Sequence, residues 1–153
     1  MLRVTKLTDY ATVVLTVLAA QPDTVLSASD LAERAGLETP TVSKLLKPLA
    51  QAGLVEGFRG TRGGYRLARA AGEIGLIEIV EAMEGPLAIT ECSIHEGQCG
   101  IEDQCGVRAN WRRINDVVID ALRSVTLQQM LASPAASAAP GTAKRIDLRL
   151  ANA

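Results

Sequence analysis

Three cysteines and one histidine are the residues of this chain whose chemistry best suits a bound metal or cluster. Cys92, Cys99 and Cys105 lie within a span of fourteen residues, and the sequence has no other cysteine. The only histidine, His95, lies between the first two. Thiolates are strong ligands for iron–sulfur clusters and for zinc, and the glycines of this segment suit a loop that wraps closely around a bound group. The segment therefore predicts an iron–sulfur cluster (2Fe-2S or 4Fe-4S).

Two other interpretations of the cysteines stay open. The first is structural zinc held by the three cysteines and His95, although zinc loops usually contain a pair of ligands two to four residues apart. Here six residues separate the first two cysteines and five separate the second pair. The second is a thiol switch, in which two cysteines form a disulfide under oxidants. An odd number of cysteines fits a reducing compartment, so we expect a cytoplasmic protein.

A cluster bound by three thiolates of one chain needs a further ligand. His95 lies inside the cysteine segment. Asp9 lies at the start of a predicted helix and could reach the cysteines of a partner in a dimer, although an aspartate at a helix start is most often a favourable first-turn charge. The remaining candidates are acidic residues of the cysteine segment, more simply read as solvated charges: Glu96, Glu102 and Asp103.

The elements before the cysteines have the order of a winged helix-turn-helix domain. Capping residues and apolar spacing predict helices that begin at Thr8, Ser27 and Thr39. The predicted elements are helices over 8–20, 27–36 and 39–52, and strands over 54–58 and 65–67 around a basic, glycine-rich turn. Pro48 should kink or shorten the third helix. We expect a mainly α fold whose third helix reads DNA and whose hairpin forms the wing.

Hydroxyl and basic side chains on the third helix and the wing are the candidate DNA contacts. Hydroxyl and ammonium groups can meet base edges and phosphates, and arginine is favoured in a narrow minor groove. Each set could instead be an ordinary solvated face. The candidates are Thr41, Ser43, Lys44 and Lys47 on the helix, and Arg59 and Arg62 on the wing.

Charge supports the same division of the chain. Residues 1–70 hold nine basic and six acidic side chains, whereas residues 71–132 hold four basic and ten acidic ones. A mildly basic first part suits double-stranded DNA. With one histidine, no nucleotide-binding loop and no paired catalytic carboxylates, the sequence gives no sign of an enzyme. A small iron–sulfur electron-transfer or carrier protein is the alternative of another class, but it leaves the basic wing without a role.

The second part of the chain predicts a dimer. We expect helices over 76–84, 107–122 and 126–131. The second of these has apolar residues at intervals of three and four, a continuous stripe that commonly packs against a partner helix. We therefore expect a winged-helix domain over 1–70, a cluster loop with dimerisation helices over 71–132, and a disordered tail over 133–153. The apolar run over 11–20 is too short to cross a membrane, so we assign it to the core and expect no membrane partner.

Several motifs together resemble the Rrf-two type winged-helix transcription regulators, a family that has IscR-like and NsrR-like branches. The resemblance covers residues 1–131. Judged by residues 6–12, it is strongest to the branch associated with the SUF iron–sulfur assembly genes. The matching motifs are VTKLTDYA over 4–11, LAQAGLV over 49–55, RGTRGGY over 59–65, IVEAMEGP over 79–86, the three cysteines, Trp111 and the pair Thr126 and Leu127.

The resemblance implies a homodimer on a pseudo-palindromic promoter site, with Cys92, Cys99 and Cys105 as cluster ligands. IscR-like proteins carry a histidine ligand three residues after the third cysteine, where this chain has Arg108. NsrR-like proteins use an aspartate of the first helix, and Asp9 matches that position. The resemblance therefore favours Asp9 over His95. It also implies a repressor of SUF genes that senses its cluster, with a nitric-oxide or redox sensor as the alternative.

Overall fold

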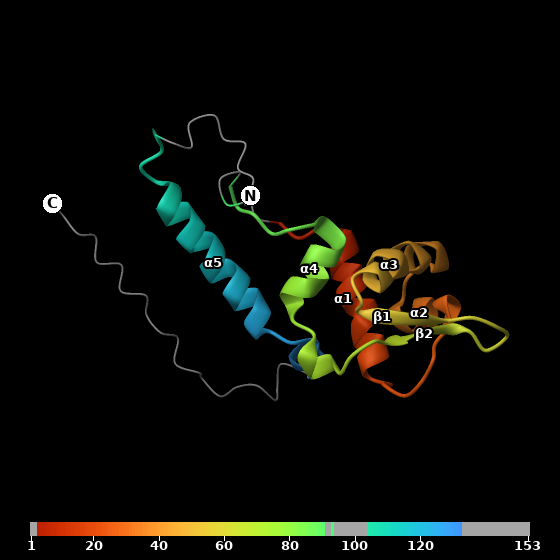
Figure 1. Cartoon of the computed structure of the whole chain (residues 1–153). Coiled ribbons are helices and arrows are strands. Elements are labelled where there is room, and N and C mark those ends of the chain that lie inside the picture. The colour runs from red at the N-terminus through yellow and green to blue at the C-terminus, as the bar shows by residue number, and fades with distance from the viewer. Residues whose placement is uncertain (1–2, 91–92, 94–103, 133–153) are drawn as a thin grey trace.

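The computed structural model describes residues 3–90, 93 and 104–132, so Cys92, His95 and Cys99 lie outside the described residues. The described part is mainly helical with one antiparallel two-stranded sheet, which confirms the predicted winged helix-turn-helix (Figure 1). Its elements are α1 Lys6–Ala19, α2 Ala28–Ala35, α3 Thr39–Gln51, β1 Val55–Phe58, β2 Gly64–Leu67, a 3-10 turn Ala71–Glu73, α4 Leu76–Glu84, α5 Arg108–Ser124 and α6 Leu127–Leu131.

Local capping explains where α1 and α2 begin, and the expected starts of α1 and α3 need correction. The capping box of Ser27 and Asp30 is present as predicted. Thr8 does not cap α1, because Thr5 precedes it and accepts the Thr8 N–H at 3.3 Å. Thr39 does not cap α3 either, because it is already helical and Glu38 is the N-cap, without a side-chain hydrogen bond. α3 also continues through Pro48 to Gln51.

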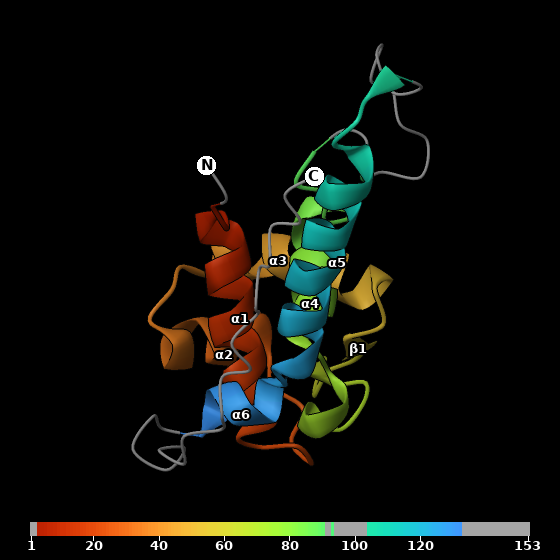
Figure 2. The same ribbon diagram turned by 90° about the vertical axis from the view of Figure 1, so that its left-hand side faces the viewer.

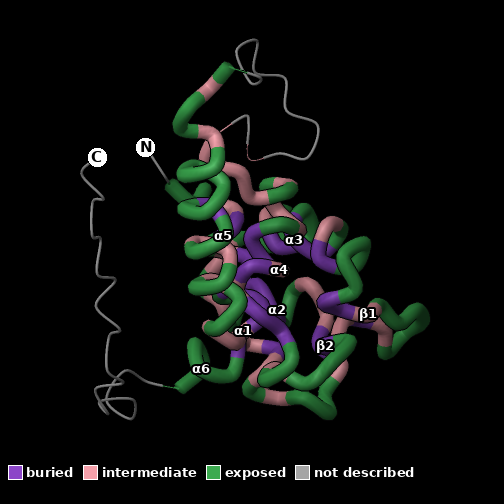
Figure 3. The backbone as a smooth tube through the Cα atoms, turned by 60° about the vertical axis from the view of Figure 1, so that its left-hand side comes forward, coloured by how far each residue is buried: buried purple, intermediate pink, exposed green. Residues whose placement is uncertain are grey.

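A single apolar core joins the first part of the described chain to its last helix. Leu15 of α1, Leu45 and Leu49 of α3, Ile79 of α4 and Leu127 of α6 are all fully buried in one cluster. Figure 3 shows these buried segments at the centre, with α5 largely exposed. Burial of this apolar surface is the main favourable term in folding. One residue predicted for the core, Val13, is 37% exposed on the outer side of α1.

The wing is attached to the helices through the segment before α2. In the hairpin, Val55 lies opposite Leu67 and Phe58 lies opposite Gly64. Leu26 exchanges two backbone hydrogen bonds with Tyr65, at 3.0 and 2.8 Å. A Cβ atom at Gly64 would meet the Leu26 backbone, so this close approach requires glycine. The wing therefore has a fixed position relative to α2 and α3.

Of the helices after the wing, α4 and α6 pack against α1, whereas α5 packs against α4. α4 lies between α1 and α5 in Figure 1, and in Figure 2 α5 lies in front of α4. α6 packs against α1, and the Leu127 N–H donates to the Ile74 carbonyl at 2.9 Å. Asn115 is the only buried residue of α5. No helix among the described residues is long and apolar enough to cross a lipid bilayer.

Candidate DNA-binding surface and cysteine segment

α3 places the predicted DNA contacts on its solvent side. Ser43, Lys44 and Lys47 are exposed, and Thr41 is half-buried. The opposite face of the helix packs in the core through Val42, Leu45, Leu46 and Leu49. This division follows from helical periodicity, since residues three and four apart share a face. The structure therefore leaves the candidate hydroxyl and ammonium groups available to a ligand, and base contacts by them stay a prediction.

The turn between β1 and β2 carries two unpaired arginines at the tip of the wing. Arg59 and Arg62 are exposed, and neither forms an ion pair with a carboxylate of the described chain. Arg66, nearer the base of the wing, pairs with Glu56 and lies 5.1 Å from the centre of the Phe58 ring. The charge of Arg66 is thus largely compensated, whereas the two tip charges can meet phosphates.

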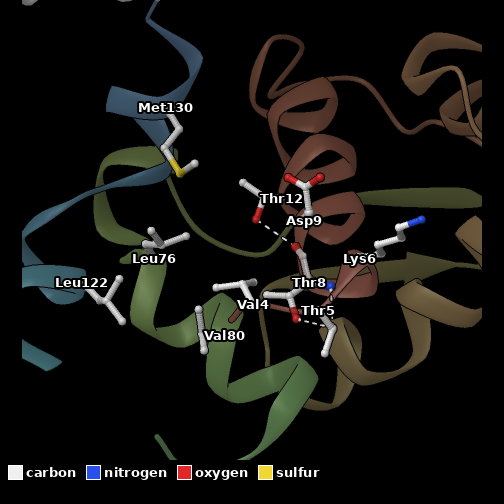
Figure 4. Close-up of a pocket in the computed structure, with 10 residues that line it drawn as sticks. All are labelled: Val4, Thr5, Lys6, Thr8, Asp9, Thr12, Leu76, Val80, Leu122 and Met130. Carbon is white, nitrogen blue, oxygen red and sulfur yellow. Dashed lines mark hydrogen bonds between the residues drawn. The ribbon is translucent and has the colours of Figure 1, made fainter. Parts of the chain in front are cut away.

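Asp9 lies beside an apolar groove on the side of the molecule where α1, α4, α5 and α6 meet (Figure 4). The groove has a volume of about 370 Å³. Asp9 is exposed on the first turn of α1, where its charge suits the helix N-terminus. The apolar residues that line the groove are Val4, Leu76, Val80, Leu122 and Met130. The position of Asp9 on an open, largely apolar surface is compatible with a role in a dimer.

Glu84, which no sequence pattern singles out, connects the end of α4 to the start of α1. Its carboxylate accepts the Thr8 hydroxyl at 2.5 Å and the Thr5 N–H at 2.8 Å. These two hydrogen bonds hold the pKa of Glu84 below its ordinary value, and the bond from Thr8 has the larger effect. Thr8 is buried inside the first turn of α1, and its hydroxyl donates to this carboxylate. Thr5 and Glu84 are 79 residues apart, so no local pattern could have indicated the pair.

Of the three cysteines predicted as cluster ligands, only Cys105 lies among the described residues. It is a free, half-buried thiol three residues before Arg108, the first residue of α5. A free thiol with partial access suits a metal or cluster ligand. No three His, Cys, Asp or Glu side chains gather into a metal site within the described ranges. Cys92, Cys99 and His95 fall outside those ranges, so the ligand set stays a prediction; the same holds for Glu96, Glu102 and Asp103.

A second unexpected contact joins the segment before the cysteines to α5. The Ile89 N–H donates to Oδ1 of Asn115 at 3.1 Å. Asn115 lies outside the apolar stripe predicted for this helix, and no local sequence pattern indicates that its side chain is buried. Next to this contact, the Ser93 N–H donates to the Thr90 carbonyl at 2.9 Å.

Comparison with known proteins places these features in one family. The model of the Rrf2 family, described as an iron-dependent transcriptional regulator, matches residues 4–133. Protein aau3 of Rhizobium meliloti (strain 1021) is 34% identical over 131 residues, which are 85% of either chain. The HTH-type transcriptional regulator IscR of Xenorhabdus nematophila is 31% identical over 85% of this chain and 79% of its own.

A solved structure shows the same arrangement of elements. CymR of B. subtilis, described as its global cysteine regulator, superposes with a TM-score of 0.66 at 28% sequence identity. The match covers 86% of this chain and 97% of CymR. The similarity therefore includes α4, α5 and α6 as well as the winged helix.

Proposed function

Because this chain belongs to the Rrf2 family of transcriptional regulators, we propose that it senses an iron–sulfur cluster and represses SUF iron–sulfur assembly genes. Members of the family bind DNA to regulate transcription and are not enzymes, and this chain is such a DNA-binding regulator. Family membership favours this role over that of an electron-transfer or carrier protein. The proposed ligands are Cys92, Cys99 and Cys105 of one protomer and Asp9 of the other.

The location of the cysteines in the chain is the observation that carries the proposal. They lie between α4, which packs on the DNA-binding helices, and α5, which is the proposed dimerisation helix. Cys105 is a free thiol close to the start of α5. The backbone therefore joins the cysteines directly to α4 and to α5. A change in the group that the thiols bind can thus affect both the DNA-binding part and the proposed dimerisation helix. The description of the family as iron-dependent supports iron as the bound metal.

Two exposed surfaces support the DNA-binding and dimeric parts of the proposal. α3 and the wing present the hydroxyl and basic side chains expected to meet bases and phosphates. α5 and its N-cap present a row of exposed apolar residues: the N-cap Val107, then Trp111, Ile114 and Val117. Exposed apolar rows of this kind mark protein interfaces. A dimer would place two α3 helices at successive turns of the major groove, about 34 Å apart.

The proposed mechanism rests on how the described residues are connected. A bound cluster would link the thiolates to one another and supply sensitivity to iron supply and oxidants. Glu84 fixes the end of α4 to the start of α1, and Asn115 fixes Ile89 to α5. The position of the cysteine segment is thereby coupled to α1 and to the helix that sets the spacing of the two α3 helices. A two-state regulator needs a structural difference between its states, which here would be the spacing of the two α3 helices.

The first test is anaerobic purification with visible absorption and iron and sulfide analysis. We expect a coloured protein that contains both elements, and loss of the colour in Cys92→Ala but not in the neighbouring Ser93→Ala. Asp9→Ala should destabilise the cluster more than His95→Ala. Promoter DNA from SUF genes should bind the cluster-loaded and cluster-free proteins with different affinity at one fixed salt concentration. Equal affinities would contradict the sensing mechanism while leaving DNA binding intact.

A thiol-based regulator is the second candidate, because Cys105 is a free and partly accessible thiol. It predicts protein that stays colourless and metal-free after anaerobic reconstitution, with DNA affinity that changes on mild oxidation. Stoichiometric zinc without colour would instead indicate a structural site. A nitric-oxide sensor with the same cysteines would hold the cluster and control other promoters, so promoter identity separates it from the main proposal.

A further inference from the structure

Glu38 is an exposed acidic residue at the start of the helix that carries the candidate DNA contacts. It is the N-cap of α3, with an extended backbone (φ −79°, ψ 140°) and no side-chain capping hydrogen bond. Among the residues that the structure describes, its carboxylate also forms no ion pair. Serine, threonine, aspartate and asparagine are the favoured N-caps, because their side chains accept the first free N–H groups of a helix. Capping therefore does not explain a glutamate at this position.

The start of α3 is a place that bound DNA would approach. α3 lies with the wing on one side of α1, whereas α4 and α5 lie on the other side (Figure 1). In helix-turn-helix proteins, the N-terminal residues of the second helix of the motif contact base edges in the major groove. Because this chain belongs to a family of DNA-binding regulators, the same end of α3 is expected to face the bases.

The charge of Glu38 distinguishes it from the other exposed side chains of this surface. Ser43, Lys44 and Lys47, further along α3, carry hydroxyl or ammonium groups, and such groups can meet phosphates as well as bases. A carboxylate is repelled by phosphates, so it lowers affinity for DNA unless it meets a hydrogen-bond donor. An element that is repulsive towards most sequences and attractive towards a few is a means of specificity.

The choice of base follows from the groups that the major groove presents. Cytosine presents its N4 amino group there and adenine its N6 amino group, whereas guanine and thymine present acceptor oxygens. The adenine amino group lies beside the N7 acceptor, a pattern that matches an amide side chain, which can donate and accept. A carboxylate can only accept, so N7 is unfavourable to it. Cytosine is therefore the base that Glu38 matches.

We propose that Glu38 is a specificity-determining residue of DNA binding: its carboxylate accepts the N4 amino group of a cytosine at one position of the binding site and disfavours thymine or guanine there. The proposal rests on the DNA-binding activity of the family. It goes beyond the proposed function, because it involves neither the cysteines nor a bound cluster.

The test selects binding sites for the full-length protein from a random library of double-stranded DNA. Fluorescence anisotropy at one salt concentration then measures affinity for the selected sequence and for its single-base variants. Glu38→Ala removes the carboxylate, and Glu38→Gln replaces it with an amide. Glu38→Ser supplies a favoured N-cap without the charge, so it separates base preference from helix stability. Glu33→Ala, at an exposed position on α2, controls for the loss of one negative charge.

We expect the wild type to prefer cytosine over thymine at one position by about fivefold or more, the lower end for one specific base contact. Glu38→Ala and Glu38→Ser should bring this ratio close to one, keep the preferences at the other positions and bind random DNA more tightly. Glu38→Gln should prefer adenine at the same position, because an amide matches its N6 and N7 groups. Glu33→Ala should keep the wild-type ratio.

Three results would overturn the proposal. They are recovery of the cytosine preference in Glu38→Ser, which would make Glu38 a helix cap only, an unchanged base profile in Glu38→Ala, and a wild type that enriches no sequence. The outcome is separate from that of cluster sensing. A base preference that depends on Glu38, in a protein whose DNA affinity is equal with and without a cluster, would end the sensing mechanism and leave the role of Glu38 standing.

Discussion

Glu84 joins two helices through a carboxylate at the surface of the molecule. It accepts the N–H of Thr5, the N-cap of α1, and the hydroxyl of Thr8 in the first turn of that helix. A negative charge at this end of a helix is favourable because the unpaired N–H groups carry partial positive charge. Glu84 therefore acts as a capping residue for α1, although it lies 76 residues after Thr8 in the chain.

The lowered pKa of Glu84 predicts how stability depends on pH at this contact. A carboxyl whose folded pKa lies below its ordinary value of 4.5 stabilises the fold above that value. The contribution is lost as the pH falls through the lower, folded pKa. Glu84→Gln should reduce the free energy of unfolding at pH 7 by about 0.5–1 kcal/mol, because the site is exposed and screened. The difference from wild type should shrink on acidification below 4.5.

Urea unfolding at several pH values measures this prediction. Glu81→Gln, at an exposed position earlier on α4, controls for the loss of one negative charge. A difference between wild type and Glu84→Gln that stays constant from neutral pH to well below 4.5 would contradict the assignment.

The two arginines at the tip of the wing are expected to bind phosphate or the minor groove. Arg59→Ala and Arg62→Ala should each weaken DNA binding on specific and non-specific sequences alike, and each should lower the salt slope of log K by about one. Arg123→Ala removes the same charge from the far end of α5, where Arg123 pairs with Asp120 at 2.7 Å. Fluorescence anisotropy over a range of salt concentrations is the measurement. Equal slopes for the wing variants and wild type would exclude these contacts.

At the scale of elements, α5 combines length with an almost complete lack of burial within its own protomer. It spans Arg108–Ser124, yet only Asn115 is buried. Helices of globular proteins obtain most of their stability from packing an apolar face. The exposed row that contains Trp111 and Ile114 therefore requires another surface, and a second copy is the partner predicted from the sequence.

A charge placed in this row should separate the protomers. Trp111→Glu is expected to convert a dimer into a monomer at micromolar concentration, because a carboxylate buried without a partner is strongly unfavourable. Asn110→Glu, at an exposed polar position on the same helix, should leave the dimer intact. Sedimentation velocity measures the mass of each. A wild type that is monomeric throughout, or a Trp111→Glu variant that stays dimeric, would show that α5 is not the interface.

The predictability of the elements depends on how local their causes are. α4 was predicted at its observed bounds, and the capping box at Ser27 was found, because the signals lie within a few residues. The cap of α1 was misplaced because Thr8 is a good capping residue by type, and only the distant Glu84 shows that it has another partner. The contact between Asn115 and Ile89 was missed for the same reason, since the two are 26 residues apart.

The candidate DNA contacts were easier to place than the cluster ligands. The exposure of Ser43, Lys44 and Lys47 follows from the periodicity of one helix, which a sequence displays directly. Identifying the fourth ligand requires knowing which surfaces of the two protomers meet, and a single sequence does not contain that information. For that reason Asp9 and His95 could be ordered only through the resemblance to a family.

At the scale of the whole molecule, the DNA-binding helices and the last described helix share one core. Leu127 is fully buried, and its N–H is bonded to the backbone of Ile74, before α4. α6 thus completes the packing of α1, although a hundred residues and more separate them in the chain.

Loss of the Leu127 side chain should therefore destabilise the entire molecule. Leu127→Ala is expected to lower the free energy of unfolding by about 2–5 kcal/mol, the range for a buried leucine. Leu131→Ala, on the same helix but 41% exposed, should change it by less than about 1 kcal/mol. Denaturant unfolding followed by circular dichroism gives both values. A small effect of Leu127→Ala, with α1 still protected from hydrogen exchange, would mean that the winged helix folds without α6.

The position of Leu127 at the end of the core also has a consequence for biosynthesis. A ribosome makes Cys105 twenty-two residues before Leu127, which at usual rates of elongation is a delay of about 1–4 seconds. During that interval all three thiols have been synthesised, whereas the last leucine of the core has not. A translation product that stops before Leu127 has every expected DNA contact in its sequence but not the packing that holds them in place. We therefore expect incomplete copies of this regulator to bind DNA weakly.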